Sequence, residues 1–108
     1  MKIKTIDIQA NEYYDKKNGN SYFNADIILN YNTESQITIH LPMQYGYGEH
    51  YLYQSLNKLN ELKLIDFNGP LWLYCQRNNI TLRTNTKTGY KERELRVLDK
   101  GAIPILHQ

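Results

Sequence analysis

Hydrophobic and polar residues alternate most clearly between Ser21 and Tyr31. Hydrophobic residues occupy nearly every second position there, with Tyr22, Asn24 and Asp26 between them. A two-residue period is typical of a β-strand that turns one face to a core and the other to water. We therefore predict a half-buried strand in this segment.

The segments on either side also have a strand-like pattern. Three isoleucines between residues 3 and 8 indicate an earlier strand, and Asn18-Gly19 is a strong hairpin signal between it and the next. Residues 37–41 alternate again until Pro42, which cannot donate a ladder hydrogen bond. Together the three segments predict an antiparallel meander.

The middle of the chain changes to a helical period. Leucines recur every three or four positions from Leu52 to Leu62, which predicts the main helix. Pro70 is suited to the first position of a second, short helix that ends near Asn78-Asn79, although the same apolar run could also form a strand. We expect these helices to cover one face of the sheet.

The last part of the chain alternates twice more. Ile80 and Leu82 are followed by the polar loop 85–89, and Leu95 and Val97 then alternate with charged residues. This pattern predicts a second hairpin, which is basic. The expected fold is therefore α+β: a single antiparallel sheet in the order β-β-β-α-α-β-β, packed by one main and one short helix.

Length and composition are consistent with a single globular domain spanning residues 1–108. Its mean hydropathy of -0.67 suggests a modest core, so a homo-oligomer is compatible with the sequence. Cys75 is the sole cysteine, so no intramolecular disulfide can form, and we expect a small buried residue rather than a nucleophile. The chain lacks a signal-peptide pattern and an apolar run of about 20 residues, which predicts a soluble cytoplasmic protein without membrane contact.

The charge is distributed unevenly along the chain. Residues 1–76 contain six Lys or Arg against eight Asp or Glu, whereas residues 77–108 contain seven against three. A basic C-terminal part indicates an anionic partner more strongly than the net charge of +2 does.

A turn rich in tyrosine and glycine comes before the main helix. Glycine allows close approach of a ligand, and a helix N-terminus presents unpaired N–H groups to an anion. A purely structural turn explains the same residues equally well. The predicted ligand-binding residues are Tyr45, Gly46, Tyr47, Gly48, His50 and Tyr51.

The predicted basic hairpin is the second candidate site. Its cationic side chains could follow a phosphate backbone while a tyrosine stacks on an unpaired base. Glu92 and Glu94 weaken this field and could instead form cross-strand ion pairs, so a solvated, salt-bridged face is the alternative. The predicted nucleic-acid-binding residues are Arg83, Lys87, Tyr90, Lys91, Arg93 and Arg96.

Catalytic and metal-binding patterns are not found in the sequence. His40 falls on the polar side of a strand, where we expect a solvated ring, His107 lies in the C-terminal tail, and no histidine has a partner at metal-ligand spacing. The carboxylates are scattered, and no nucleophile pattern or phosphate-binding loop occurs. We therefore expect no metal site, no cofactor and no enzymatic activity.

Short motifs resemble a known group of proteins. Residues 14–23, YDKKNGNSYF, and 41–48, LPMQYGYG, are similar to small uncharacterised proteins of bacteriophages and prophages, and the similarity extends through residues 72–75 and 82–85. The resemblance implies a phage-type accessory protein acting in the host cytoplasm, and it supplies no catalytic residues.

Two functions are compatible with these features. The first is a module that binds nucleic acid or nucleotide phosphates through the Tyr-Gly turn and the basic hairpin. The second is an inhibitor or adaptor that binds a host protein, such as one of anti-phage defence, with the ten tyrosines providing an interface.

Overall fold

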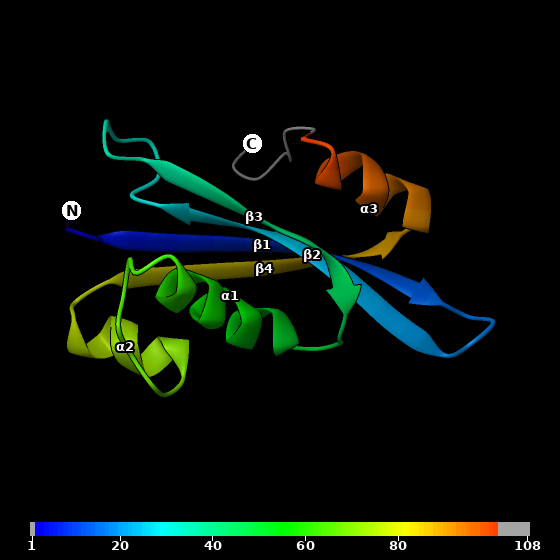
Figure 1. The fold of residues 1–108 in the computed structure, drawn as a ribbon, viewed down its shortest axis with the longest axis horizontal. Helices are drawn as coiled ribbons and strands as arrows, with labels where there is room; N and C mark the ends of the chain where they lie inside the picture. The colour runs from blue at the N-terminus through cyan, green and yellow to red at the C-terminus, as the bar shows by residue number, and fades with distance from the viewer. Residues whose placement is uncertain (1, 102–108) are drawn as a thin grey trace.

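The computed structural model describes residues 2–101 and contains one four-stranded sheet and three helices. The sheet order is β3-β2-β1-β4, with α1 and α2 on one face and α3 on the other (Figure 1). The α+β class and the single sheet are confirmed. In chain order the elements are β1 (Thr5–Asp15), β2 (Asn20–Leu29), β3 (Ile37–Tyr45), α1 (His50–Glu61), α2 (Leu71–Arg77), β4 (Thr81–Tyr90) and α3 (Glu92–Asp99).

The N-terminal meander forms as the alternation predicts. β1 pairs antiparallel with β2, and β2 pairs antiparallel with β3. At the first turn, Gly19 adopts φ 69° and donates its N–H to the carbonyl of Asp15, whose carboxylate also accepts hydrogen bonds from Lys17 N and Asn18. This turn fixes the register that places Asp15 opposite Asn20.

The predicted antiparallel sheet is wrong in one strand, so the sheet is mixed. β4 pairs with β1 in parallel, with Thr5 opposite Thr81. The chain leaves β3, passes through α1 and α2 on one face, and returns on the far side of β1. A return over a sheet face after a pair of helices permits this parallel pairing, whereas a tight hairpin does not.

The predicted second hairpin is also wrong, because residues 92–99 form α3 instead of a strand. Glu94 accepts a hydrogen bond from Lys91 N at 2.9 Å, and Arg96 donates to Glu92 one turn away at 3.1 Å. Both interactions are typical of helices, and Glu, Arg and Leu are strong helix formers. Alternation over only four residues was a weaker signal than these spacings.

The hydrophobic core lies between the sheet and α1. Ile6, Ile8 and Ala10 of β1 are adjacent to Leu29, Ile27 and Ala25 of β2 on the same face, and all six are buried. Leu56 and Leu59 of α1 and Leu71 and Cys75 of α2 belong to the same cluster. Cys75 is therefore the buried residue expected, and burial raises the pKa of its thiol to about 11.

The opposite face of the sheet is polar and also buried, which corrects the expectation of a half-buried β2. Asn24 is fully buried: its Oδ1 accepts from Asn11 at 3.1 Å, and its amide donates to the Leu95 carbonyl at 2.9 Å. Leu95 is fully buried as well. The helix that the sequence pattern predicted as a strand therefore covers part of this face.

His40 was expected to be solvated, but it lies in an ionic network beneath α3. Its Nδ1 lies 3.0 Å from Asp26 and its Nε2 lies 2.7 Å from Asp99, and the side chain is 27% exposed. Asp99 also accepts hydrogen bonds from Asn24 and from Met43 N. These interactions join the C-terminal end of α3 to β2 and β3.

No helix within residues 2–101 is long and apolar enough to cross a membrane. His107 lies outside the described residues.

The His40 network predicts a pH-dependent stability. The hydrogen bond to Asp26 is the main cause that raises the pKa of His40; partial burial opposes it, and Asp99 adds to it. The contribution of His40 to folding stability is therefore complete below about pH 6.5 and is lost as pH rises through the raised pKa. Burial opposes ionisation of Asp99, but hydrogen bonds from His40, Met43 N and Asn24 lower its pKa overall. Its contribution is present above about pH 4 and is lost as pH falls through the lowered pKa.

We therefore expect His40→Gln to lower the free energy of unfolding by about 2 kcal/mol between roughly pH 4 and 6.5, and by less on either side. Urea unfolding at a series of pH values measures this difference. His50→Gln is the control, because the His50 ring contacts Gln54 rather than a carboxylate. A difference for His40→Gln that does not vary with pH would contradict the ionic role.

Candidate aromatic surface at one end of the sheet

Four tyrosines, one from each strand, occupy one line across the polar face of the sheet. We call them the tyrosine row. The register places Tyr22 of β2 opposite both Tyr13 of β1 and Tyr45 of β3, and Tyr13 opposite Tyr90 of β4. Because paired residues share a face, four phenol side chains from distant parts of the chain converge at the end of the sheet.

Ring contacts order the centre of this row. The Tyr13 and Tyr22 rings are stacked with centroids 6.0 Å apart, and Tyr22 and Tyr45 meet edge to face at 5.9 Å. Tyr45 is 58% exposed, and the other three members are partly exposed. The row therefore presents supported aromatic surface to solvent.

Partial desolvation, together with the carboxylates of Asp15 and Glu92, raises the pKa of Tyr13. The phenol therefore stays protonated at neutral pH and can donate a hydrogen bond as well as stack. Glu92 is the first residue of α3, so the start of this helix lies close to the row.

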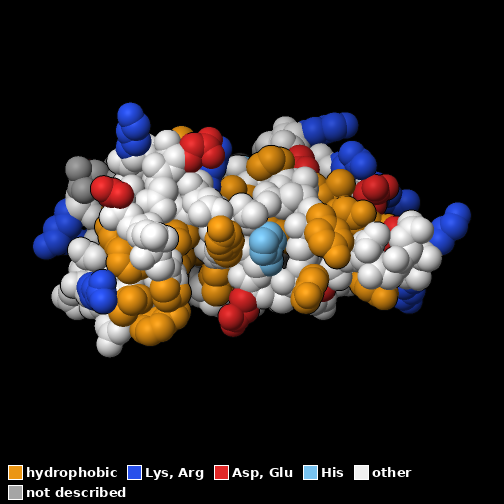
Figure 2. Space-filling model, turned by 60° about the horizontal axis from the view of Figure 1, so that its bottom comes forward, with side chains coloured by type: hydrophobic (Ala, Val, Ile, Leu, Met, Phe, Trp, Pro, Cys, Tyr) orange, Lys and Arg blue, Asp and Glu red, His pale blue; other side chains and the backbone are white. Residues whose placement is uncertain are grey.

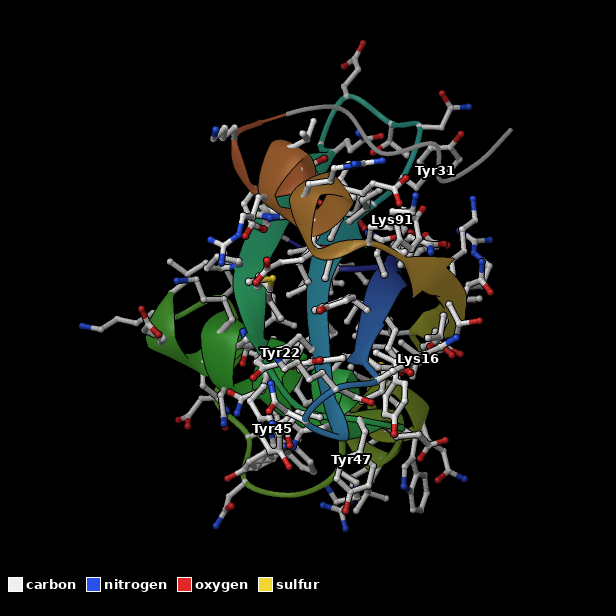
Figure 3. The ribbon with its side chains drawn as sticks, turned by 90° about the vertical axis from the view of Figure 1, so that its right-hand side faces the viewer. Lys16, Tyr22, Tyr31, Tyr45, Tyr47 and Lys91 are labelled. Atoms are coloured by element: carbon white, nitrogen blue, oxygen red, sulfur yellow. The ribbon has the colours of Figure 1, made fainter. Side chains whose placement is uncertain are left out.

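Cationic side chains surround the row. Lys16 and Lys17 are exposed in the β1–β2 turn, and Lys91 precedes α3. Figure 3 shows this end of the molecule, with Tyr22, Tyr45, Tyr47 and Lys16 around the hairpin and Lys91 farther from it, near the start of α3. Beside Tyr90, an open hollow of about 360 Å³ is lined by Lys87, Thr88, Gly89, Tyr90 and Glu94.

The predicted Tyr-Gly site is divided by the structure. Tyr45 joins the row, and Tyr47 is 71% exposed at the same end. Tyr51 is buried in the core. The His50 ring meets Phe23 edge to face at 6.1 Å and lies 5.8 Å from Tyr53, so it packs on the helix-covered face.

The glycines of this turn have different environments. Gly46 has φ 157°, and a Cβ there would lie 2.6 Å from His50 Cδ2 and 2.8 Å from Phe23 Cε1. Gly48 has φ 61°, but nothing lies within 4 Å of the position its Cβ would take. Close packing therefore requires glycine at position 46, whereas backbone conformation alone favours it at position 48.

The predicted basic residues do not form one hairpin. Arg83 donates two hydrogen bonds to Asp7, at 2.6 and 2.9 Å, and these raise the pKa of its guanidinium. It lies seven residues from Tyr90 along β4, roughly 23 Å at strand spacing. Arg96 contacts Glu92, and Arg93 is exposed on α3. Of these predicted residues, Tyr90 belongs to the row, and Lys87 and Lys91 lie beside it.

The sequence contains a signal for Tyr13 and Tyr22, the two tyrosines of the row that were not among the predicted site residues. A two-residue turn at Asn18-Gly19 predicts a register that differs slightly from the observed one. Any hairpin closed near that dipeptide nevertheless brings Tyr13 and Tyr22 close together. Lys16 and Lys17 then fall beside them. The missing step was to apply the hairpin register to the tyrosines.

Other chemistry is limited in the described part of the chain. Residues 2–101 contain no group of three or more His, Cys, Asp or Glu side chains placed to hold a metal ion. Both ring nitrogens of His40 already contact carboxylates.

The two glycines allow a matched test of the turn. We expect Gly46→Ala to lower the free energy of unfolding by about 2–4 kcal/mol, because it adds a steric clash to an unfavourable backbone conformation. Gly48→Ala should cost about 1–2 kcal/mol from backbone conformation alone. Chemical denaturation of both variants measures the difference, and an equal loss of stability would contradict the packing role of position 46.

Comparisons of this chain with models of protein families, with curated proteins and with solved structures find no significant match.

Proposed function

We propose that this protein binds single-stranded nucleic acid on the tyrosine row. The observation that supports this most directly is the alignment of Tyr13, Tyr22, Tyr45 and Tyr90 across four neighbouring strands. Aromatic rings on a rigid sheet offer stacking partners to unpaired bases, and stacking contributes about 1–3 kcal/mol per base.

The geometry favours a single strand over a duplex. Neighbouring strands of a sheet are about 4.8 Å apart, so successive tyrosines can contact successive splayed bases of a strand that crosses the sheet. Bases in a duplex are stacked on one another, and their faces cannot reach the rings without unpairing. A single-stranded nucleic acid that crosses all four β-strands would place about four nucleotides on the row.

Lysines near the row can bind the phosphate groups of the nucleic acid. Lys16 and Lys17 lie at the hairpin, and Lys91 lies beside the start of α3. Binding of phosphates by lysine releases condensed counterions and makes affinity fall with salt. Asp15 and Glu92 reduce the local positive potential, so we expect a modest affinity that depends on stacking as well as on charge.

The alternative function is binding of a host protein on the same surface, and the binding tests below distinguish the two. Exposed tyrosines with polar tips also suit protein partners. The predicted relation to phage proteins suits either partner, and a reduced, buried Cys75 is compatible with action in a cytoplasm.

The first test uses adjacent tyrosines that face opposite ways. We expect Tyr13→Ala to weaken binding of a labelled single-stranded oligonucleotide about tenfold, measured by fluorescence anisotropy at low salt. Tyr14→Ala is the matched control, because Tyr14 is 51% exposed on the opposite face of β1 and should change affinity little.

Circular dichroism of both variants separates loss of folding from loss of binding. Equal weakening by the two substitutions, or no binding by the unaltered protein, would contradict the proposal. In the second case, the tyrosine row would be better explained as a protein interface.

The second test concerns the salt dependence. We expect affinity to fall steeply between low and near-physiological salt. The double substitution Lys16→Gln with Lys17→Gln should reduce the slope of log K against log salt by about 0.7 for each phosphate that the protein no longer binds. Lys63→Gln, a change in an exposed lysine beyond α1, is the control. A slope that is equal in all three proteins would exclude phosphate binding at the hairpin.

A further inference from the structure

A second concave site lies on the other face of the sheet, between α1 and the segment 67–72 that leads into α2. Its volume is about 470 Å³, within the range of small-molecule sites. Figure 2 shows hydrophobic side chains gathered over this part of the molecule, toward the α2 end. We call it the Trp72 pocket.

Specific interactions hold the wall of the pocket in place. Asn60 of α1 donates its side-chain amide to the Phe67 carbonyl at 2.8 Å, and its Oδ1 accepts from Phe67 N at 3.0 Å. The Phe67 ring packs against Tyr74, with centroids 5.3 Å apart, and a Cβ at Gly69 would lie 2.9 Å from the Phe67 ring. The cavity is therefore built by fixed packing rather than by a loose loop.

Two large aromatic side chains at the pocket are unusually exposed. Trp72 is 60% exposed and Tyr53 is 56% exposed, and both line the cavity. Leu52, Leu56 and Leu82 supply apolar surface between them. Exposed aromatic rings beside an apolar cavity indicate a surface that can hold a flat, apolar group by stacking.

The polar residues that line the pocket limit the class of ligand that it can bind. The side chains of Asn57 and Asn68 make no hydrogen bond within residues 2–101, and each carboxamide offers both a donor and an acceptor. Glu49 is the single charged residue lining the cavity in the described part of the chain. Its carboxylate disfavours an anionic ligand, while the carboxamides complement a ring that carries both donors and acceptors.

We infer that the Trp72 pocket binds an uncharged planar heteroaromatic group of nucleoside size, and that it discriminates against the phosphorylated form. The inference is independent of the proposed function, because the tyrosine row lies on the opposite face of the sheet. The pocket would hold one base-like ring against Trp72 and Tyr53, with Asn57 and Asn68 paired to its edge.

The chain supplies its own reporter for the test, since Trp72 is its only tryptophan. We expect adenosine or uridine to change the tryptophan fluorescence of the intact protein saturably. Adenosine monophosphate should bind at least several-fold more weakly, because its phosphate meets Glu49 without a cation in the described lining. Two-dimensional NMR spectra provide a second readout, in which shifts should cluster at α1 and residues 67–72.

Matched variants locate the site. Tyr53→Ala should weaken nucleoside binding about tenfold while retaining the reporter. Tyr47→Ala removes a tyrosine that is even more exposed and does not line the pocket, so it should leave the affinity unchanged. Tyr13→Ala should also leave it unchanged, which separates this site from the tyrosine row.

Three results would overturn the inference. The first is no saturable fluorescence change and no localised NMR shift at millimolar nucleoside. The second is equal weakening by Tyr53→Ala and Tyr47→Ala in proteins that remain folded. The third is saturable binding of tetramethylammonium in place of nucleosides, which would assign the aromatic rings and Glu49 to recognition of a cation.

Discussion

The hydrogen-bond network between α3 and the polar face of the sheet is the interaction on which the arrangement of this protein depends. Asn24 contacts Asn11, the Leu95 carbonyl and Asp99, and Asp99 in turn contacts His40 and Met43 N. Each buried polar atom would cost more without its partner than the bond contributes, so the network opposes any shift of the helix. An apolar face could have held α3 in several registers, whereas this face specifies a single one.

The docking of α3 has a direct consequence for the candidate surface. The helix begins just after β4 and covers the middle of the polar face, so the end of the sheet that carries the tyrosine row stays open. Its first residue, Glu92, adds to the partial desolvation and the Asp15 carboxylate that raise the pKa of Tyr13, and Lys91 lies at its start. The position of the helix therefore sets both the extent of the exposed aromatic surface and the charges beside it. Two rings of the row contact Tyr22, so the surface is ordered before any ligand arrives, which lowers the entropic cost of stacking.

Patterns among residues close together in the sequence predicted the parts of the fold that depend on such neighbours. The Asn18-Gly19 turn and the alternation in β2 predicted the meander, and leucine spacing predicted α1. The parallel position of β4 depends on a path through two helices, which no local period reveals. α3 was missed because four alternating residues resemble a strand, while the spacing of Lys91 to Glu94 and of Glu92 to Arg96 indicated a helix. This one error also hid the burial of Asn24 and the role of His40, since both follow from the helix that covers them.

The candidate site was predicted only in part for a related reason. Tyr45, Tyr90, Lys87 and Lys91 were identified from local features, but the row is a product of register across four strands. β1 is central because it pairs with β2 on one side and β4 on the other, and Tyr13 lies where both pairings meet. A shift of one residue between β1 and β4 would turn Tyr90 to the opposite face, and a shift between β1 and β2 would separate Tyr22 and Tyr45 from the other two, so either shift would break the row. The turn at Gly19 and the docking of α3 on the middle of the polar face both oppose such shifts. The aromatic surface is therefore a consequence of the fold as a whole, and a substitution in the polar network could alter it without touching a tyrosine.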